Sequence, residues 1–284
     1  LRLSAAQSLD QNLVDCFVGN NLKDMHSMTA SGAMAQKWGQ SKLQALIENF
    51  GETGDTPYDL FVRLHKTLKE TQPEVAKLAD DLRKTAKNVN FGAAYGAQAS
   101  KLAEQLIIPV HDAESFLQAK YAMFPRFEEW KAEVENETSN LGYTTTPMGA
   151  RRHLRDSLMS TEWGVADKAL RQAPNFKIQG AAAEQTKLAM ARLWKSGILH
   201  KLDMVFFAPI HDELVWSVSK EDALESIKVI NECMTAPYGG SNIPFLGSIS
   251  LGLNFGDQIE VGDWVIESRI LAALEKCFPI EVKA

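Results

Sequence analysis

Residues 83–96 read Arg83-Lys84-Thr85-Ala86-Lys87-Asn88-Val89-Asn90-Phe91-Gly92-Ala93-Ala94-Tyr95-Gly96. On a helix with about 3.6 residues per turn, four side chains spaced four residues apart share one broad face. These are Arg83, Lys87, Phe91 and Tyr95. The face therefore carries two cations followed by two aromatic rings. Cations suit a polyanionic tail and rings suit a flat base, so the order of this stripe matches that of a nucleotide.

The alternative is an ordinary packing helix, because aromatic residues at this spacing more often form a core face and helical Lys and Arg are more often solvated. Two glycines favour the ligand interpretation. Gly92 and Gly96 each cost a helix roughly 1 kcal/mol relative to Ala. Beside the rings, such small residues would let a ligand approach the backbone. We therefore expect a helical nucleotide site over residues 83–96.

The amino-acid composition indicates which broad class of protein this chain belongs to. The chain has 284 residues, of which 45% are hydrophobic and 23% charged, as expected of a soluble globular protein with room for two lobes. No stretch approaches the roughly 20 apolar residues of a membrane span, and the opening residues lack a signal-peptide pattern, so we expect a cytosolic protein. The three cysteines, Cys16, Cys233 and Cys277, have neither disulfide-framework nor zinc-site spacing.

The charge is unevenly distributed. A formal net charge of −6 argues against indiscriminate attraction to nucleic acid. Cations nevertheless gather in two clusters, Arg83/Lys84/Lys87 and Arg151/Arg152/Arg155. A basic inner surface on an acidic body would reconcile the net charge with a nucleic-acid ligand.

Hydrophobic periodicity and turn residues predict an α+β protein. Helical patterns fill the first 50 residues and, after a loop at 51–57, residues 58–140. A hairpin is predicted at 142–149, a long helix at 179–196 and a further helix at 219–234. Strands are predicted at 204–210, 214–218 and 245–253. This order indicates a helical lobe inserted into a sheet-bearing one.

A second candidate site is the hairpin tip His211-Asp212-Glu213. Carboxylate oxygens there could hold a divalent ion. Asp and Glu are also common in ordinary turns, so the tripeptide alone is weak evidence. The flanking apolar strands, 205–207 and 214–216, would anchor the tip deep in a core, which favours the functional interpretation.

Five short segments occur in one order along the chain: Asp24-Met25-His26; the stripe of 83–96; Gly142-Tyr143 with Gly149-Ala150-Arg151-Arg152; Arg171, Asn175 and Gln179-Gly180; and His211-Asp212-Glu213. Together they resemble the motifs of family A DNA polymerases, the class that contains bacterial DNA polymerase I and many phage replicases. Five ordered matches are specific, whereas any one alone is weak.

The resemblance implies a right-hand fold with a helical fingers lobe and an antiparallel-sheet palm. Residues 1–20 would be a palm segment, 21–141 the fingers and 142–284 the palm with its metal-binding hairpin. The implied reaction is template-directed DNA synthesis, in which a deoxynucleotide passes from a dNTP to a primer 3′-OH and pyrophosphate leaves. Two Mg²⁺ ions are the expected cofactors, and primer-template DNA and dNTPs are the expected partners.

The resemblance also implies a role for each matching residue. His26, Arg83 and Lys87 would contact the incoming triphosphate, with Lys87 also acting on the pyrophosphate leaving group. Phe91 would lie beside the sugar and Tyr95 near the templating position. Asp212 would bind the catalytic metals, with Glu213 nearby. The remaining residues would touch the minor groove of the primer-template: Arg171, Asn175, Gln179 and His211.

The chain departs from the family where the first metal-binding Asp is expected. That Asp lies a few residues before Glu-Leu-Arg, and this sequence opens at Leu1-Arg2-Leu3. We therefore expect the chain to need an upstream polymerase segment, in cis or in trans, that carries the first palm motif, the thumb and a possible exonuclease. Two smaller departures are Pro209, which implies an edge strand or a bulge before the tip, and a longer stretch between His26 and Arg83.

Three alternatives follow. A single-subunit RNA polymerase is disfavoured by Glu213 after His-Asp and by the Phe91-Gly92 and Tyr95-Gly96 pairs. A non-catalytic nucleotide- or nucleic-acid-binding remnant would have kept the fold and lost the first carboxylate. A subunit of a split polymerase would receive that carboxylate from its partner. The insertion and the divergence suggest a phage source more than a bacterial chromosome.

Overall fold

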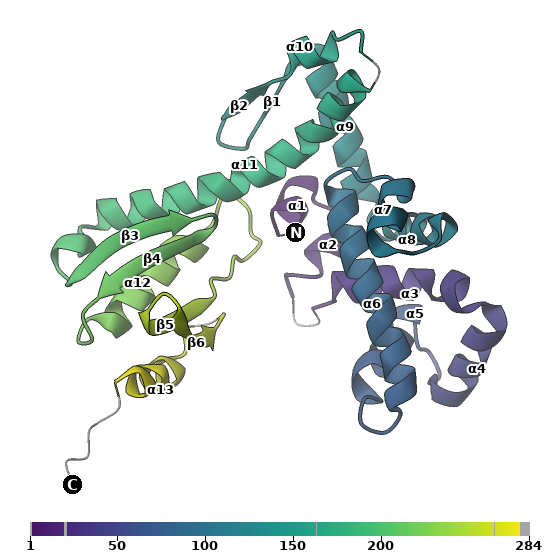
Figure 1. The fold of residues 1–284 in the computed structure, drawn as a ribbon, viewed down its shortest axis with the longest axis horizontal. Coiled ribbons are helices and arrows are strands. Elements are labelled where there is room, and N and C mark those ends of the chain that lie inside the picture. The colour runs from purple at the N-terminus through teal and green to yellow at the C-terminus, as the bar shows by residue number, and fades with distance from the viewer. Residues whose placement is uncertain (1, 20–21, 163, 264, 279–284) are drawn as a thin grey trace. The chain divides into compact units, whose positions relative to one another are not determined.

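The structure is a computed structural model that describes residues 2–19, 22–162, 164–263 and 265–278 (Figure 1). The predicted boundary between residues 20 and 21, residue 1 and the end of the predicted palm from 279 lie outside the described residues. The chain divides by contacts into two compact units. Unit 1 comprises Leu3–Thr145 and Arg151–Ile178, and unit 2 comprises Thr146–Ala150 and the chain from Gln179 onward. The assignment of fingers to 21–141 and palm to 142–284 stays a prediction.

Unit 1 is mainly helical. Its helices are α1 (Arg2–Ser8), α2 (Gln11–Val14), α3 (Met25–Trp38), α4 (Gln40–Phe50), α5 (Pro57–Val62), a π-helix (Arg63–Thr67), α6 (Pro73–Ala94), α7 (Ala99–Leu106), α8 (Val110–Met123), α9 (Pro125–Leu141), α10 (Arg155–Leu158) and the first half of α11 (Val165–Ser196). The predicted helical region is confirmed, and Pro73, Pro109 and Pro125 each stand at the start of a helix, where the missing N–H is tolerated.

The core of unit 1 forms around α6. Five buried positions, spaced three and four residues apart, make one face of this helix: Ala79, Leu82, Ala86, Val89 and Ala93. They pack in one cluster with residues of α3, α5, α7 and α8, which include Met34, Phe61, Leu102 and Phe116. Because this face is committed to the core, the positions next to it, including 83, 87 and 91, lie toward the outside of the unit.

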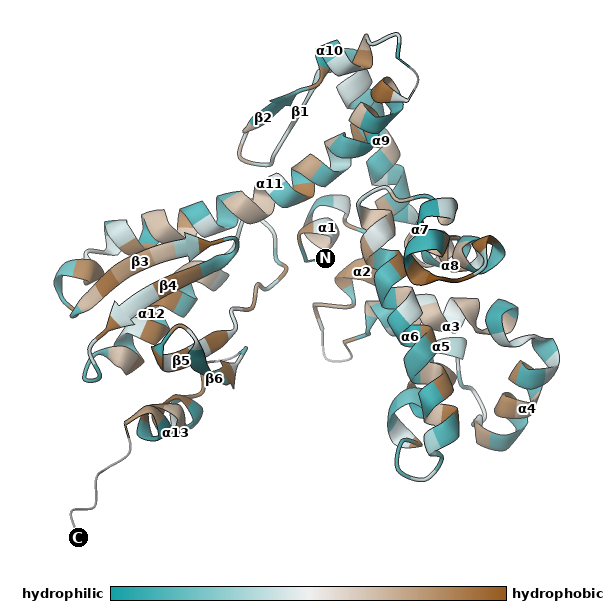
Figure 2. Ribbon diagram, viewed as in Figure 1, coloured by the Kyte–Doolittle hydropathy of each residue, from teal (hydrophilic) through white to brown (hydrophobic). Residues whose placement is uncertain are grey.

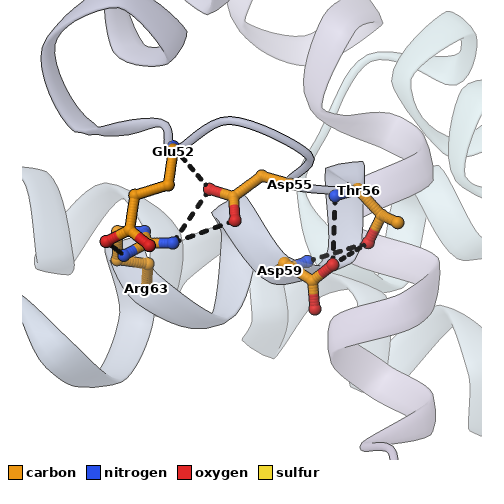
Figure 3. Close-up of polar contacts among 5 residues, drawn as sticks. All are labelled: Glu52, Asp55, Thr56, Asp59 and Arg63. Atoms are coloured by element: carbon orange, nitrogen blue, oxygen red, sulfur yellow. Dashed lines mark hydrogen bonds and ion pairs between the residues drawn. The ribbon is translucent and has the colours of Figure 1, made fainter.

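The stretch between His26 and Arg83 is tied together by polar contacts (Figure 3). Arg63 contacts Glu52 and donates from Nη2 to both carboxylate oxygens of Asp55 at 2.9 Å. Thr56 and Asp59 form a capping box at the start of α5. These contacts fix the loop 51–56 on α5 and the π-helix that follows it.

Helix α11 begins 14 residues earlier than the sequence predicts. The prediction placed its start at Gln179, but the structure places it at Val165 and carries Pro174 inside the helix. An internal proline removes a backbone hydrogen bond and costs about 3 kcal/mol. Burial of Ala169, Ala173 and Pro174 in unit 1 offsets that cost. The predicted end is confirmed, because Gly197 follows Ser196 with φ of 69°.

The first hairpin pairs β1 (Tyr143–Thr145) with β2 (Arg151–His153). Its second strand lies beyond the predicted range of 142–149, because Thr146–Gly149 forms the turn. In unit 2, η2 (Ile198–His200) is followed by β3 (Met204–Ile210), β4 (Glu213–Val218), α12 (Ala223–Thr235), β5 (Ile249–Asn254), β6 (Asp257–Gly262) and α13 (Glu267–Cys277). Strand β6 and helix α13 were not predicted from the sequence.

Within the described residues the strands form three separate two-stranded antiparallel sheets, β1–β2, β3–β4 and β5–β6. A small core joins α12, β6 and α13 through Ile227, Val261 and Ile270. Mainly helical structure with antiparallel sheets confirms the predicted α+β class. No helix in the described part of the chain has both the length and the apolar character of a membrane span.

Candidate functional site

The first part of the site is the start of α3. Asp24 is the N-cap of this helix, and its Oδ2 accepts hydrogen bonds from the backbone N–H of Ser27 at 3.1 Å and from its hydroxyl at 2.5 Å. The same oxygen accepts the Nε–H of Arg83 from α6 at 2.6 Å. The backbone N–H of Asp24 donates to the hydroxyl of Tyr58 on α5 at 2.9 Å. Three helices therefore converge on Asp24, two of them on its carboxylate.

The ionisation of Asp24 follows from these bonds. Burial opposes the charged form, but the hydrogen bonds from Arg83 and Ser27 outweigh it and lower the pKa of Asp24 to about 2. The carboxylate is thus ionised at neutral pH and holds Arg83 by one N–H. An Arg side chain has five N–H donors, so four belong to its other nitrogens and can meet an anion.

His26 is the second residue of α3 and is buried, with 8% of its surface exposed. Its ring centroid is 5.6 Å from that of Phe91, and its Nδ1 is 3.2 Å from Nδ2 of Asn90. Burial is the main reason that the pKa of His26 falls to about 4; Asp24 opposes the shift, whereas Arg83 and Lys87 add to it. At neutral pH the ring is therefore uncharged.

Most of the stripe on α6 is exposed. Lys87 is exposed, and Phe91 and Tyr95 have 39% and 55% of their surfaces exposed. The helix ends two residues earlier than expected, at Ala94, so that Tyr95 is its C-cap. His26, Arg83 and Phe91 are joined through direct contacts or through Asp24, and Lys87 is close enough to act on the pKa of His26. One compact unit therefore brings together the predicted nucleotide-binding residues of α3 and α6.

The interpretation of the two glycines is wrong. A Cβ at Gly92 would lie 2.4 Å from Cδ2 of Leu102, so this glycine permits close packing of α6 on α7 rather than access for a ligand. Gly96 has φ of +78°, directly after the helix C-cap, and a Cβ there would lie 3.2 Å from Cδ of Arg171. Both glycines serve the fold of unit 1.

The second part of the site is the turn between β3 and β4. Ile210 pairs with Glu213, so the turn consists of His211 and Asp212 alone, and Glu213 is already the first residue of β4. His211 has φ of +57°, a left-handed conformation that is uncommon for residues other than Gly. The side chains of His211, Asp212 and Glu213 are exposed. The described residues contain no cluster of three His, Cys, Asp or Glu side chains suited to a metal ion.

The turn is not anchored deep in a core, contrary to the prediction. Val205 has 62% and Phe207 has 76% of its surface exposed. Both lie on β3, which Figure 2 colours mostly as hydrophobic. Phe206, with 38% of its surface exposed, packs on Trp216 with ring centroids 4.8 Å apart. The register shifts between Phe206 and Ala208, which confirms the bulge or edge that Pro209 implied.

A cavity of about 520 Å³ lies beside the turn in unit 2. It is lined by Asp212, Glu213 and the inner residues of β4, by α12, and by residues 246–251 at the start of β5. Two buried polar atoms on residues that line it, Nε1 of Trp216 and Oδ1 of Asn231, have no hydrogen-bond partner within the described part of the chain. In that same part, β4 pairs with β3 alone and β5 with β6 alone.

The predicted DNA-binding residues lie on two elements. Arg171, Asn175 and Gln179 follow one another at i+4 steps on α11, and His211 lies on the β3–β4 turn. Arg171 also forms an ion pair with Asp167, one turn earlier in the helix. Arg152 of β2 donates to Gln172 of the same helix at 2.8 Å.

Sequence reasoning missed three residues that organise the site. Asp24 was recognised only as a neighbour of His26, although Asp directly before a helical segment is a common N-cap. Tyr58 and Asn90 act through tertiary hydrogen bonds, for which a single sequence carries no periodic signal.

Comparison with known proteins identifies a family and relatives that this chain resembles. The model of the family described as DNA polymerase family A matches residues 39–257. The thermostable DNA polymerase I of Thermus aquaticus is 34% identical over 157 residues, 55% of this chain and 18% of that protein. DNA polymerase I of Borreliella burgdorferi is 27% identical over 217 residues, 76% of this chain and 23% of that protein. The chain thus spans about a fifth of the length of these relatives.

Among solved structures, the chain is similar to the POL domain of Pol1 from M. smegmatis in complex with DNA primer-template and dNTP, with a TM-score of 0.63 and 28% identity, covering 86% of this chain and 36% of that one. This likeness confirms the predicted polymerase right-hand fold. The relatives named above are bacterial, and the phage source stays a prediction. Because the family match covers most of the chain, including the stripe on α6 and the turn between β3 and β4, this chain belongs to DNA polymerase family A.

Proposed function

We propose that this chain forms the fingers and most of the palm of an enzyme that transfers a deoxynucleotide from a dNTP to a primer 3′-OH on a DNA template. The observation that carries the proposal is the face of α3 and α6, where a held Arg83, an exposed Lys87 and a neutral His26 lie next to the exposed ring of Phe91. Phosphoryl transfer depends on positioning and charge neutralisation, which these groups can supply.

Each residue of this face has a proposed task. Arg83, Lys87 and His26 hold the triphosphate, and Lys87 also neutralises the pyrophosphate as it leaves. Phe91 lies beside the sugar, and Tyr95 lies near the templating base. Aromatic rings suit these neighbours because every base and sugar presents a face that a ring can contact.

Asp212 and Glu213 are the proposed metal ligands. Their carboxylate oxygens are the donors that Mg²⁺ prefers, so the donor set fits in kind. Two ligands are too few, because two adjacent exposed carboxylates do not make a site for two ions. When bound, two Mg²⁺ ions would stabilise the attacking and leaving oxygens. A further carboxylate must then come from the upstream polymerase segment.

The cavity in unit 2 supports an upstream partner. Its walls are β4 and the start of β5, and each of these strands is paired on one edge only within the described residues. An extended strand placed there could bond to both free edges and satisfy Trp216 and Asn231. It would also bring a side chain next to Asp212, which lines the same cavity.

Primer-template DNA is the proposed macromolecular partner. Arg171, Asn175, Gln179 and His211 would read the minor groove, where acceptors at fixed positions report a correct pair. The exposed Arg151 and Arg152 of β2 add positive charge for the phosphate backbone. We place this activity in the cytosol.

The test compares this chain alone with the chain joined to the upstream segment of its gene. We expect both to bind dNTP, and we expect only the longer protein to extend a primer when Mg²⁺ is added. An upstream sequence with Asp a few residues before Glu-Leu-Arg would agree with this outcome. A longer protein that binds DNA and dNTP without extending the primer would reject the proposed reaction.

A second candidate is a nucleotide-binding protein without polymerase activity. The absence of a three-residue metal cluster among the described residues favours it. The same experiment separates the two, because this candidate binds dNTP in both forms and extends a primer in neither.

A further inference from the structure

Asn90 is a fully buried polar residue that directly precedes Phe91 on α6, with 0% of its surface exposed. Its carboxamide lies between two residues of α3. The hydroxyl of Thr29 donates to Oδ1 of Asn90 at 3.1 Å, and Nδ2 of Asn90 lies 3.2 Å from Nδ1 of His26. Thr29 is itself fully buried, and its hydroxyl is also 3.3 Å from the carbonyl oxygen of Met25. Burial of polar groups costs free energy unless their hydrogen bonds are formed, so two fully buried polar side chains at this place point to a role for their hydrogen bonds.

The direction of these bonds sets the proton on the histidine ring. Because Oδ1 of Asn90 accepts from Thr29, the amide nitrogen of Asn90 faces His26. An amide nitrogen only donates, so Nδ1 of His26 must accept. A neutral imidazole carries one proton, which then resides on Nε2. Burial, Arg83 and Lys87 keep the ring neutral at neutral pH despite the opposing effect of Asp24, in agreement with this arrangement.

We propose that Asn90 is a positioning residue that holds His26 as the Nε2–H tautomer, so that a neutral N–H donor faces the triphosphate beside Arg83 and Lys87. This inference rests on the proposed function for the identity of the ligand. Nδ1 and Nε2 lie on opposite sides of the ring, so a ring that turns Nδ1 toward the buried Asn90 turns Nε2 away from it. A neutral donor adds a bond to a phosphate oxygen without adding a third cation to the crowded face.

The opposite arrangement has a clear signature. If Thr29 gave its proton to Met25 and accepted from a rotated Asn90 amide, Oδ1 would face the ring and Nδ1 would carry the proton. Nε2 would then present a lone pair to the triphosphate and repel it. The two arrangements differ in which ring nitrogen is protonated, and nitrogen chemical shifts report this directly.

The experiment uses the whole chain with ¹⁵N-labelled histidine, and the His26 signals are assigned from the His26→Gln variant. We expect a protonated Nε2 and an unprotonated Nδ1 in the unchanged protein near pH 7. Asn90→Asp replaces the donor with an acceptor and should move the proton to Nδ1. Because a buried carboxylate can prevent folding, Thr29→Val is the second variant; it removes the group that orients the amide and should yield a mixture of tautomers. Thr138→Val is the matched control, since Thr138 is also fully buried on a helix and its hydroxyl donates to its own helix.

The functional measurement is binding of dTTP with Mg²⁺ to the same proteins. Loss of one hydrogen bond to a charged phosphate predicts roughly 10- to 100-fold weaker binding for Asn90→Asp, which moves the proton, about 2-fold weaker binding for Thr29→Val, in which part of the rings keep the Nε2 proton, and no change for Thr138→Val. A protonated Nδ1 in the unchanged protein, or ring signals that do not respond to either α3–α6 variant, would overturn the inference. Equal losses in Thr29→Val and Thr138→Val would overturn the positioning role. If no protein binds dTTP, the proposed function fails and with it the donation to phosphate, while the nitrogen shifts still decide the tautomer.

Discussion

The face of α3 and α6 and the turn between β3 and β4 carry the two halves of the predicted chemistry, and they are built in opposite ways. On the first, Asp24 accepts three hydrogen bonds, Asn90 and Thr29 are fully buried, and Tyr58 supports the helix start from a third element. On the second, Asp212 and Glu213 are exposed on a two-stranded sheet.

This difference separates the residues proposed to bind the nucleotide from those proposed to catalyse its transfer. The contacts that orient the predicted triphosphate ligands lie within one compact unit, so that part of the site is organised by this chain itself. The carboxylate turn borders a cavity with unsatisfied polar atoms and strand edges that no described strand pairs. We therefore expect changes at the first region to act on binding and stability, and changes at the second to act on catalysis.

The largest expected effect is that of Asp212→Ala in the protein joined to its upstream segment. Loss of a metal-binding carboxylate should lower primer extension by about 1,000-fold or more, while DNA binding stays largely intact. Primer extension and a DNA-binding assay on the same preparation measure both. Asp257→Ala is the matched control, because Asp257 is also an exposed carboxylate at the end of a hairpin turn. Extension retained by Asp212→Ala would refute the metal role.

Acid is expected to weaken the α3–α6 face specifically. The pKa of His26 is about 4 in the folded protein, below its ordinary value of 6.5, so between these values only the unfolded chain binds the proton. The stability present above pH 6.5 is therefore lost as the pH falls through 4, by up to about 3 kcal/mol. Asp24, whose pKa is lowered to about 2 from 3.8, adds a loss only below pH 3.8.

Hydrogen exchange of α3 and α6 at a series of pH values measures this loss. In His26→Gln the change between pH 6.5 and 4 should become smaller, because the titrating group is gone. His153→Gln, an exposed histidine on β2, controls for the removal of a histidine elsewhere. An unchanged pH dependence in His26→Gln would show that another group controls the acid response.

Features set within one helix could be predicted from the sequence, whereas features that depend on a contact with another element could not. The buried and exposed faces of α6 were predictable because both obey the period of a single helix. The role of Gly92 was not, because it depends on Leu102 of another helix. The early start of α11 was missed since tertiary burial of Pro174 overrides local propensity. The exposure of β3 was missed because an apolar run shows which residues can be buried and not whether a partner covers them.

The next effect concerns the packing of α6 on α7. Gly92→Ala adds a Cβ that would lie 2.4 Å from Cδ2 of the buried Leu102. Overpacking of this kind costs about 1–3 kcal/mol, and the better helix propensity of Ala returns roughly 1 kcal/mol, so a net loss of about 1–2 kcal/mol is expected. Urea unfolding measures it. In a Leu102→Ala background the same change should be neutral or stabilising, and an equal loss there would place the strain elsewhere.

The smallest effect is expected for Arg63→Met, which removes the ion pairs of the loop 51–56 (Figure 3). Glu52 is largely exposed, so its pair is worth little, whereas the contact of Nη2 with both oxygens of the mostly buried Asp55 should give a small but measurable loss of unfolding free energy. Urea unfolding compared with Arg126→Met, which breaks an exposed bidentate pair with Glu133, isolates the effect of burial. Since α5 carries Tyr58 to Asp24, Arg63→Met should also raise hydrogen exchange at the start of α3, which Arg126→Met should leave unchanged. Exchange that rises in neither variant would show that the inserted stretch does not support the α3–α6 face.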